Sequence, residues 1–442
     1  MLKAIRGLDR AKEALAARRL PDQEPLSPEA EQRIAAAFGQ PLPPREVVRR
    51  ILEDVRSQGD AALRHYTERL DGKTLQELEV SKAEQAQATK QVSPDLIQAL
   101  KVAAERVRAF HQASLPKSWV DQAQGLGELF TPVERVGIYV PGGTASYPST
   151  VLMTAIPARV AGVSEIFLTT PAREGSLPDP AVLAAAELVG VDRVFRVGGA
   201  QAIAALAFGT ESIPRVDKVC GPGNIFVTLA KEQLAGSVGI DGLYGPTETV
   251  IVADGTASAA FCAADLLAQA EHDPLASPSL ITTSQELIAN VEKELERQLP
   301  QLERREVAQA ALDRHGCAIL LDSLEEALEL ANFVAPEHLC LMVQEPWTWA
   351  GKVRHAGGLF LGEFSPEVTG DYVAGPSHTM PTGGTARFSS ALGVRHFLKS
   401  IPVVGLQREQ LEKLAPFGAT IARAEGLTGH ARALELRLRE KG

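Results

Sequence analysis

The chain is poor in the residues that mark several whole classes of protein. Of its 442 residues only four are cysteines, Cys220, Cys262, Cys317 and Cys340, and no two stand in a C-x-x-C spacing. Each lies in an apolar stretch, so we expect buried free thiols in a reducing cytoplasm, not disulfides or a thiolate metal site. No apolar run approaches the roughly 18 residues of a membrane-spanning helix. The basic, amphipathic N-terminus also lacks the apolar region of a secretory signal.

Runs of lysine and arginine are absent as well. The formal net charge is -10, which argues against a nucleic-acid-binding surface. A hydrophobic content of 45% with 23% charged residues is typical of a soluble globular protein. The chain is too long for one ordinary core, so we expect two or more domains.

The pattern along the chain changes near Arg135. Residues 45–112 are helical in pattern, and Ser93-Pro94 there is a helix start with its cap; His65 and His111 within these helices are expected to be surface or packing residues. Beyond Arg135, short β-rich runs alternate with Ala-rich helical segments, twice over, which predicts two α/β modules with parallel sheets. Residues 370–390 are rich in Gly, Pro, Ser and Thr and are expected to form an ordered functional loop.

Three glycine-rich turns follow predicted strands, at residues 141–144, 198–201 and 220–224. In an open parallel sheet, ligands bind at the carboxyl ends of the strands, where helix N-termini present N–H groups to anions. The three turns together favour a phosphate- or dinucleotide-binding crevice. None completes G-x-G-x-x-G, and tight packing of a strand against a helix would explain any one of them alone.

An adjacent carboxylate and imidazole, Glu337-His338, follow Pro336. Proline disfavours helix at the residue before it, so the helical pattern of 324–333 should end there and 338–343 should form a buried strand. Such a pair can act as a general acid and base. Taken alone, the dipeptide is equally compatible with a surface Glu-His at the start of a strand.

A second polar group lies at the end of an apolar helical segment. Gln269 and His272 are three residues apart and share a helical face, and an oxygen with an imidazole nitrogen suits zinc. Asp371 and His430 are further candidate ligands downstream. No spacing rule links these four positions, and ordinary roles for His272 and His430 remain open.

From about Arg135 to its C-terminus the chain resembles the histidinol dehydrogenase family. The first 130 residues or so carry little signature. The resemblance rests on many separate blocks, which are VGIYVPGG from Val136, GGAQAIAALAFGTE from Gly198, GPGN from Gly221, QAEHDP from Gln269, APEH from Ala335, GDYVAG from Gly370, TARFSS from Thr385 and EGLTGH from Glu425.

The resemblance implies a role for each matching position. The acid/base pair is Glu337 and His338, and one zinc ion per subunit is held by Gln269, His272, Asp371 and His430. The NAD contacts are Tyr139, Gln201 and Asn224. The substrate-binding residues are Thr247, Gln269, His272, His338, Asp371, His378, Glu425 and His430. Thr247 stands where Ser is usual and Ser377 where many members have Asn, so both departures touch the expected substrate pocket.

The implied activity is the four-electron oxidation of L-histidinol to L-histidine with two NAD+, in histidine biosynthesis. The implied fold is α/β, with two incomplete Rossmann-like modules and helical arms in a cytoplasmic homodimer with shared active sites. We expect an N-terminal helical arm at 1–30, a first α/β domain at 31–138 plus 247–392, an NAD-binding domain at 139–246 and a C-terminal helical arm at 393–442. The alternatives are a zinc- and NAD-dependent dehydrogenase of another small polyol, such as a sulfonated propanediol, and a non-catalytic nucleotide-binding regulator.

Overall fold

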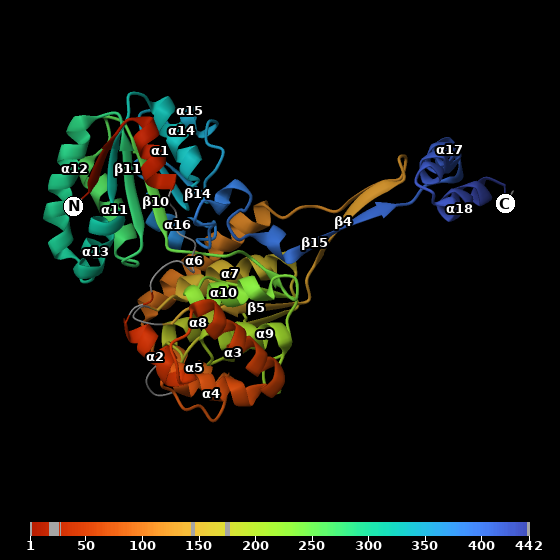
Figure 1. Ribbon diagram of the computed structural model, residues 1–442, viewed down its shortest axis with the longest axis horizontal. Coiled ribbons are helices and arrows are strands. Elements are labelled where there is room, and N and C mark those ends of the chain that lie inside the picture. Colours follow the sequence, from red (N-terminus) through yellow and green to blue (C-terminus); the bar gives the residue numbers. More distant parts are fainter. Residues whose placement is uncertain (1, 17–25, 27, 143–145, 173–176, 440–442) are drawn as a thin grey trace. The chain divides into compact units, whose positions relative to one another are not determined.

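The computed structural model describes residues 2–16, 26, 28–142, 146–172 and 177–439 (Figure 1). The chain divides into two compact units. The larger comprises Met1–Ser114 and Glu134–Phe397, and the smaller comprises Leu115–Val133 and Leu398–Gly442.

The first sheet of the larger unit has six parallel strands. Their order is β1 (Lys3–Arg6), β12 (Cys317–Leu320), β11 (Ser277–Thr282), β10 (Glu248–Ala253), β13 (His338–Met342) and β14 (Gly358–Leu361). Apolar side chains pack on both faces, which explains the continuous apolar runs of its strands. One face carries α11 (Ala259–Ala270), α12 (Gln285–Gln298) and α13 (Arg305–His315), and the other carries α1 (Leu8–Ala16) and α14 (Leu324–Val334) (Figure 1). The short helices α15 (Pro346–Ala350) and α16 (Glu367–Tyr372) follow.

The second sheet also has six strands. Their order is β2 (Glu79–Val80), β7 (Arg193–Phe195), β6 (Glu165–Thr169), β5 (Arg135–Tyr139), β8 (Lys218–Cys220) and β9 (Gly239–Ile240), and only β2 is antiparallel to its neighbour. The helices of this module are α7 (Pro148–Ala161), α8 (Pro180–Leu188), α9 (Gly199–Phe208) and α10 (Ile225–Leu234).

The N-terminal helices pack against the helices of the second sheet. They are α2 (Pro28–Phe38), α3 (Pro44–Gln58), α4 (Asp60–Asp71), α5 (Lys82–Thr89) and α6 (Pro94–Ala113). Helix α3 contacts α9 and α10, α5 contacts α8, and α6 contacts α7. The domain boundaries stay a prediction, but we propose one change to them: residues 31–114 and 134–138 group with 139–246 and not with 247–392, and residues 115–133 belong to the smaller unit.

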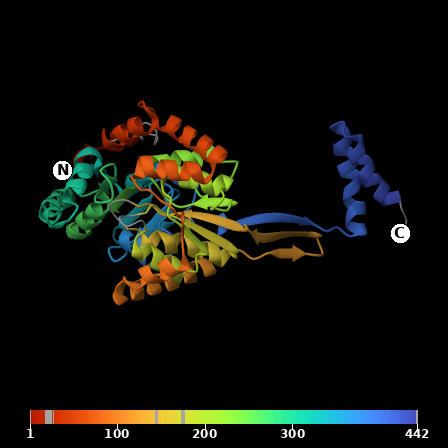
Figure 2. The ribbon, with the colours of Figure 1, turned by 90° about the horizontal axis from the view of Figure 1, so that it is seen from below.

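The smaller unit combines an antiparallel sheet with two helices. Its strands are β15 (Leu398–Val404), β4 (Leu126–Pro132) and β3 (Trp119–Asp121), in that order, and its helices α17 (Arg408–Ala424) and α18 (Thr428–Arg439) lie side by side (Figure 2). Its buried apolar cluster consists of Ala419, Ala422 and Ala431, with Leu434 packed against it. Leu414, Phe417 and Ile421 of α17 are 55%, 71% and 61% exposed.

The α/β fold with parallel sheets is confirmed, and so are the helix before Pro336 and the buried strand after it. All four cysteines are free and buried. Two predictions are wrong in part. The expected N-terminal helical arm begins with β1, an edge strand paired to β12, and α1 packs on α14. The expected C-terminal helical arm begins with β15, and β3 and β4 were not predicted. Strands β1 and β15 pair with segments distant in the chain, β12 and β4, whereas β3 and β4 pair with each other as a hairpin.

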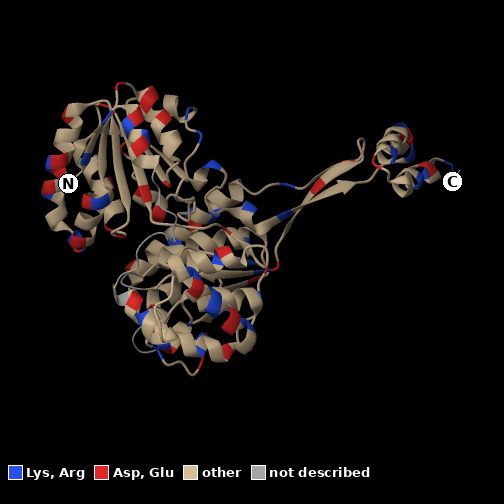
Figure 3. Cartoon of the chain, viewed as in Figure 1, with Lys and Arg blue, Asp and Glu red and all other residues tan. Residues whose placement is uncertain are grey.

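Charged residues of both signs are spread over the helices of the larger unit (Figure 3). Among the described residues there is no helix with the length and apolar character to span a bilayer.

We predict that His111 makes stability depend on pH. It lies on α6 with 1% exposure, neither ring nitrogen has a hydrogen-bond partner among the described residues, and burial lowers its pKa to about 4. A histidine pKa that is lower in the folded than in the unfolded chain stabilises the protein above pH 6.5, and this contribution is lost as the pH falls towards 4. Between pH 7.5 and pH 5 the wild type should lose about 1–2 kcal/mol more unfolding free energy than His111→Leu.

Chemical denaturation at the two pH values measures this difference. The matched control is His65→Leu, because His65 is an exposed histidine of α4. Equal pH dependence in wild type and His111→Leu would contradict the prediction.

Candidate active site

Glu337 and His338 lie between α14 and β13. Helix α14 ends at Ala335, which has a left-handed backbone (φ 50°) and donates its N–H to the Ala331 carbonyl at 2.8 Å. Pro336 prevents the helix from continuing, and His338 is the first residue of β13. The pair therefore lies at the amino edge of the first sheet, with Glu337 7% and His338 4% exposed.

The Glu337 carboxyl is held by the start of the neighbouring strand β10. Its Oε2 accepts the Thr247 hydroxyl at 2.5 Å and the Glu248 N–H at 3.1 Å. Burial is the larger influence, and it raises the pKa of Glu337 to about 8 despite these two donors. Glu337 therefore keeps its proton to a higher pH than an ordinary carboxyl, and once ionised it is the stronger base.

The His338 ring has one satisfied and one free nitrogen. Nδ1 lies 3.3 Å from the Glu248 carbonyl oxygen, which can only accept, so the ring proton is on Nδ1. Nε2 is buried without a hydrogen-bond partner among the described residues, 3.8 Å from Asp371 Oδ1. Burial lowers the pKa of His338 to about 3, so the ring is neutral and Nε2 offers a lone pair.

Gln269, at the end of α11, is 1% exposed and joins a polar group beneath this pair. Its amide nitrogen is placed to donate to Glu367 Oε1 and Thr249 Oγ1, each at 2.9 Å, and its oxygen faces Thr247 and the Glu248 N–H. The single hydroxyl proton of Thr247 serves Gln269 or Glu337 at any one time. Thr247 therefore connects Gln269 to the catalytic candidate Glu337.

Glu367 was missed in the sequence. It is 1% exposed and accepts the Thr249 hydroxyl at 2.5 Å, and burial raises its pKa. A signal was available, because Glu367 and Asp371 are four residues apart and share one face of α16. Thr150 was also missed: its hydroxyl lies 3.1 Å from His378 Nε2.

His378 and Asp371 complete the part of the site that the larger unit contributes. His378 Nδ1 lies 3.0 Å from the Asp371 carbonyl oxygen. Burial lowers the pKa of His378 to about 4, and nearby His272 contributes in the same direction. Burial raises the pKa of Asp371 to about 7. His272 itself is exposed, one turn beyond Gln269.

Two predicted residues belong to the smaller unit. Glu425 follows α17 and His430 lies in the first turn of α18, and both are exposed on that unit. The larger unit thus brings together Thr247, Gln269, Glu337, His338, Asp371 and His378, with His272 close by.

The predicted NAD contacts lie at the carboxyl edge of the second sheet. Tyr139 ends β5, and its hydroxyl accepts the Gly199 N–H at 3.2 Å. Gln201 is 1% exposed, and its Oε1 is buried with no partner among the described residues. Asn224 caps α10 through its Oδ1, which leaves its amide nitrogen available.

The backbone comes unusually close to itself at this edge. Gly221 has φ +111°, and a Cβ there would lie 2.1 Å from the Tyr139 carbonyl oxygen, so only glycine fits. The predicted turns follow β5, β7 and β8, with β6 between the first two. Gly143 and Thr144 of the first turn lie outside the described residues.

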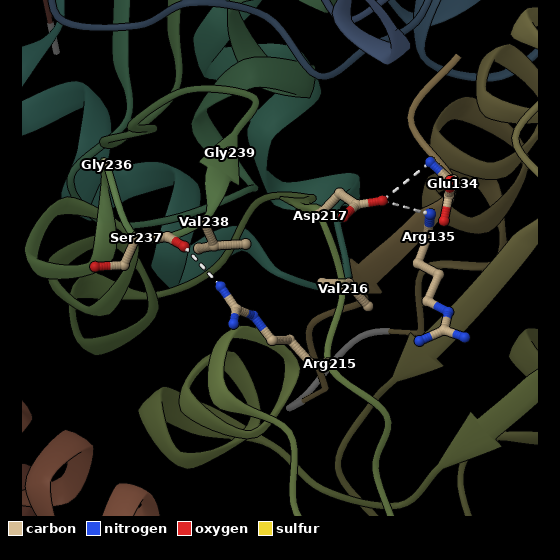
Figure 4. A pocket seen from close by; sticks show the side chains of 9 residues that line it. All are labelled: Glu134, Arg135, Arg215, Val216, Asp217, Gly236, Ser237, Val238 and Gly239. Carbon is tan, nitrogen blue, oxygen red and sulfur yellow. Dashed lines mark hydrogen bonds between the residues drawn. The ribbon is translucent and has the colours of Figure 1, made fainter.

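A pocket of about 560 Å³ lies at the opposite, amino edge of the second sheet (Figure 4). Asp217 there accepts the N–H groups of Glu134 and Arg135, and Arg215 reaches the Ser237 carbonyl at 3.5 Å. The pocket contains none of the predicted site residues, so it is not the candidate site.

The donors near Asp371 suit zinc in kind. Gln269, His272 and Asp371 supply an amide oxygen, an imidazole and a carboxylate, and the buried Asp371 carboxyl would be stabilised as an anion by a cation. No three His, Cys, Asp or Glu side chains form a metal-binding group within the described part of the chain. A complete zinc site would therefore require a further ligand from elsewhere.

Comparisons with known proteins, by sequence and by structure, all find similarity to histidinol dehydrogenases over most of the chain. A family model described as "Histidinol dehydrogenase" matches residues 43–438. A histidinol dehydrogenase of Deinococcus radiodurans is 52% identical over 421 residues, which is 94% of this chain and 96% of the relative. One of Thermus thermophilus is 53% identical over 394 residues, covering 89% and 94%. The crystal structure of histidinol dehydrogenase from Elizabethkingia anophelis has a TM-score of 0.91 at 36% identity, covering 99% and 98%.

We predict that the Thr247 hydroxyl stabilises the buried polar group. Thr247→Val keeps the shape but removes the partner of Glu337 and Gln269, so it should lower the unfolding free energy by about 1–3 kcal/mol. Thr247→Ser keeps the hydroxyl and should lie close to wild type. Denaturant unfolding of the three proteins measures this, and equal stability of the Val and Ser variants would contradict the prediction.

Proposed function

The chain belongs to the histidinol dehydrogenase family, and we propose that it oxidises L-histidinol to L-histidine through L-histidinaldehyde, using two NAD+. The observation that carries the proposal is the buried Glu337–His338 pair, in which a basic carboxyl adjoins a neutral imidazole with a free Nε2. These are the two proton acceptors that oxidation of an alcohol and then of an aldehyde requires. The reaction would complete histidine biosynthesis.

In the first step His338 accepts the substrate's hydroxyl proton at Nε2 as the carbon loses a hydride. Its Nδ1–H stays bonded to the Glu248 carbonyl, which holds the ring in place. Burial disfavours the imidazolium, so the proton must leave the ring again before the next turnover. When bound, NAD+ supplies the hydride acceptor in both steps.

In the second step Glu337 removes a proton from the water that adds to the aldehyde. Its raised pKa makes it the better base for this task, and the hydrate then loses the second hydride to give the carboxylic acid. Two hydrides, which together carry four electrons, leave the substrate in total. Tyr139, Gln201 and Asn224 would hold NAD+, a role supported by the unpartnered Gln201 Oε1.

Gln269, His272, Asp371 and His430 would hold one zinc ion per subunit. Zinc, when bound, would orient the substrate through its amine and imidazole nitrogens. Thr247, His378 and Glu425 would complete the substrate pocket, and residues 370–384 would cover it. Closing the site protects the reactive aldehyde from solvent.

We propose a homodimer in which His430 and Glu425 complete the site of a second copy. The support is physical. The buried apolar side chains among the described residues of the smaller unit are alanines, with Leu434 partly buried against them, and the unit exposes Leu414, Phe417 and Ile421. A unit with so little core needs a covering surface to be stable. The free buried cysteines support a reducing, cytoplasmic location.

Oxidation of another small polyol is not favoured. The relatives named above match this chain along nearly all of its length, and His378 and Glu425 suit an imidazole and an amine better than a sulfonate.

The yield of NADH per histidinol tests the proposed function. We expect two NADH for each L-histidinol consumed, with L-histidine as the product, because one alcohol carbon is oxidised twice. Absorbance at the NADH band with chromatography of the products measures both. One NADH per substrate, or turnover only with other diols, would refute it.

Replacing Glu337 by Gln should separate the two half-reactions. Oxidation of histidinaldehyde should fall about 10²- to 10⁴-fold, because the base for water is lost, while oxidation of histidinol falls much less. Single-turnover kinetics from each substrate measure the two steps. His338→Asn is the matched comparison and should impair the first step. Equal loss of both steps in Glu337→Gln would contradict the assignment of the first step to His338 and of the second to Glu337.

Removal of zinc should abolish turnover. Dialysis against a chelator is expected to inactivate the enzyme, and added zinc should restore it with about one ion per chain. Metal analysis and the NADH assay follow the two together. Full activity in protein shown to be zinc-free would rule out the metal assignment.

A further inference from the structure

A buried ion pair lies beneath the proposed NAD turn and has no part in the chemistry described above. Lys231 of α10 and Asp241, which follows β9, form a salt bridge with side chains 2% and 0% exposed. The Lys231 ammonium also lies 4.7 Å from the centre of the Tyr244 ring. Both charges are therefore removed from water and face each other.

The ion pair forms hydrogen bonds with both backbone polar groups of Gly221, its carbonyl and its N–H. Lys231 Nζ donates to the Gly221 carbonyl at 3.1 Å, and the Gly221 N–H donates to Asp241 Oδ2 at 2.7 Å. Asp241 Oδ1 also accepts the Gly242 N–H at 2.9 Å. Gly221 opens the turn that ends at Asn224, so the ion pair fixes the start of that turn.

The backbone conformation of this turn must be fixed by side chains from outside the turn. Gly221 has φ +111° and must be glycine because of the nearby Tyr139 carbonyl, and glycine has the widest choice of backbone conformations. A buried ion pair usually adds little stability compared with apolar side chains of similar size, since desolvation offsets the attraction. The effect expected of Lys231 and Asp241 is therefore on the geometry of the turn.

We infer that Lys231 and Asp241 are positioning residues, which hold the Gly221–Asn224 turn in the conformation that binds NAD+. The inference rests on the proposed function, because it takes this turn as part of the cofactor site. It assigns the pair to cofactor affinity and not to the proton transfers at Glu337 and His338.

The test replaces the pair as a unit, with Lys231→Met and Asp241→Leu in one protein. The KM for NAD+ should rise about tenfold, the equivalent of one lost charge-assisted contact, with kcat and the KM for histidinol within about twofold of wild type. Calorimetric titration with NAD+ alone should show the same loss of affinity. The matched control is Glu232→Gln, which removes the exposed Arg45–Glu232 pair from the same helix and should leave the KM for NAD+ unchanged.

An unchanged KM for NAD+ in a folded double variant would overturn the inference, because a merely structural pair would alter only the melting temperature. If that variant does not fold, Lys231→Met with Asp241→Asn keeps an acceptor for the Gly221 N–H. It should still raise the KM for NAD+ several-fold, and no change would again overturn the inference. Wild-type protein that is inactive on histidinol would instead refute the proposed function. The two failures are distinguishable, because the proposed function is tested with the wild type and the inference with the variants.

Discussion

The candidate site depends on the parallel pairing of β10 with β13. This register sets Thr249 opposite His338, and so brings the start of β10 against the residues just before β13. One short segment, Thr247–Glu248, then supplies a hydroxyl, an N–H and a carbonyl to Glu337 and His338. These bonds keep two ionisable groups in place inside a buried environment. They also set which ring nitrogen of His338 is free.

The proposed acid/base pair lies at the amino edge of its sheet, whereas the glycine-rich turns lie at the carboxyl edge of the other sheet. General rules for parallel sheets lead to the second edge and not to the first. Periodicity predicted the strand at His338 and the helix before it, because both signals are local. The role of Glu337 and His338 came from resemblance to a family, since no local pattern distinguishes a buried dyad from a surface one.

What the sequence could not supply was defined by distant partners. Strands β1 and β15 pair with β12 and β4, which are distant in the chain, so local periodicity carries no signal for either pairing. Glu367 could have been predicted from its spacing to Asp371. The hydrogen bonds of Lys231 and Asp241 to Gly221 could not be predicted from the sequence. These hydrogen bonds join α10, the residue after β9 and the residue after β8, which come close together only in the folded protein. Glu425 and His430 lie on the smaller unit, which has little core of its own, and their proposed place in a site depends on the proposed homodimer.

The chain passes from the second sheet to the first through residues 241–247, between β9 and β10. One end of this connection, Asp241, is bonded to Gly221 of the glycine-rich turn, and the other, Thr247, is bonded to Glu337. Two further hydrogen bonds hold the middle of the connection. The Thr228 hydroxyl donates to the Tyr244 carbonyl, and the Gly245 N–H donates to the Thr382 hydroxyl. The same connection therefore bonds to the glycine-rich turn at one end and to Glu337 at the other, so the two candidate halves of the site are joined through its backbone.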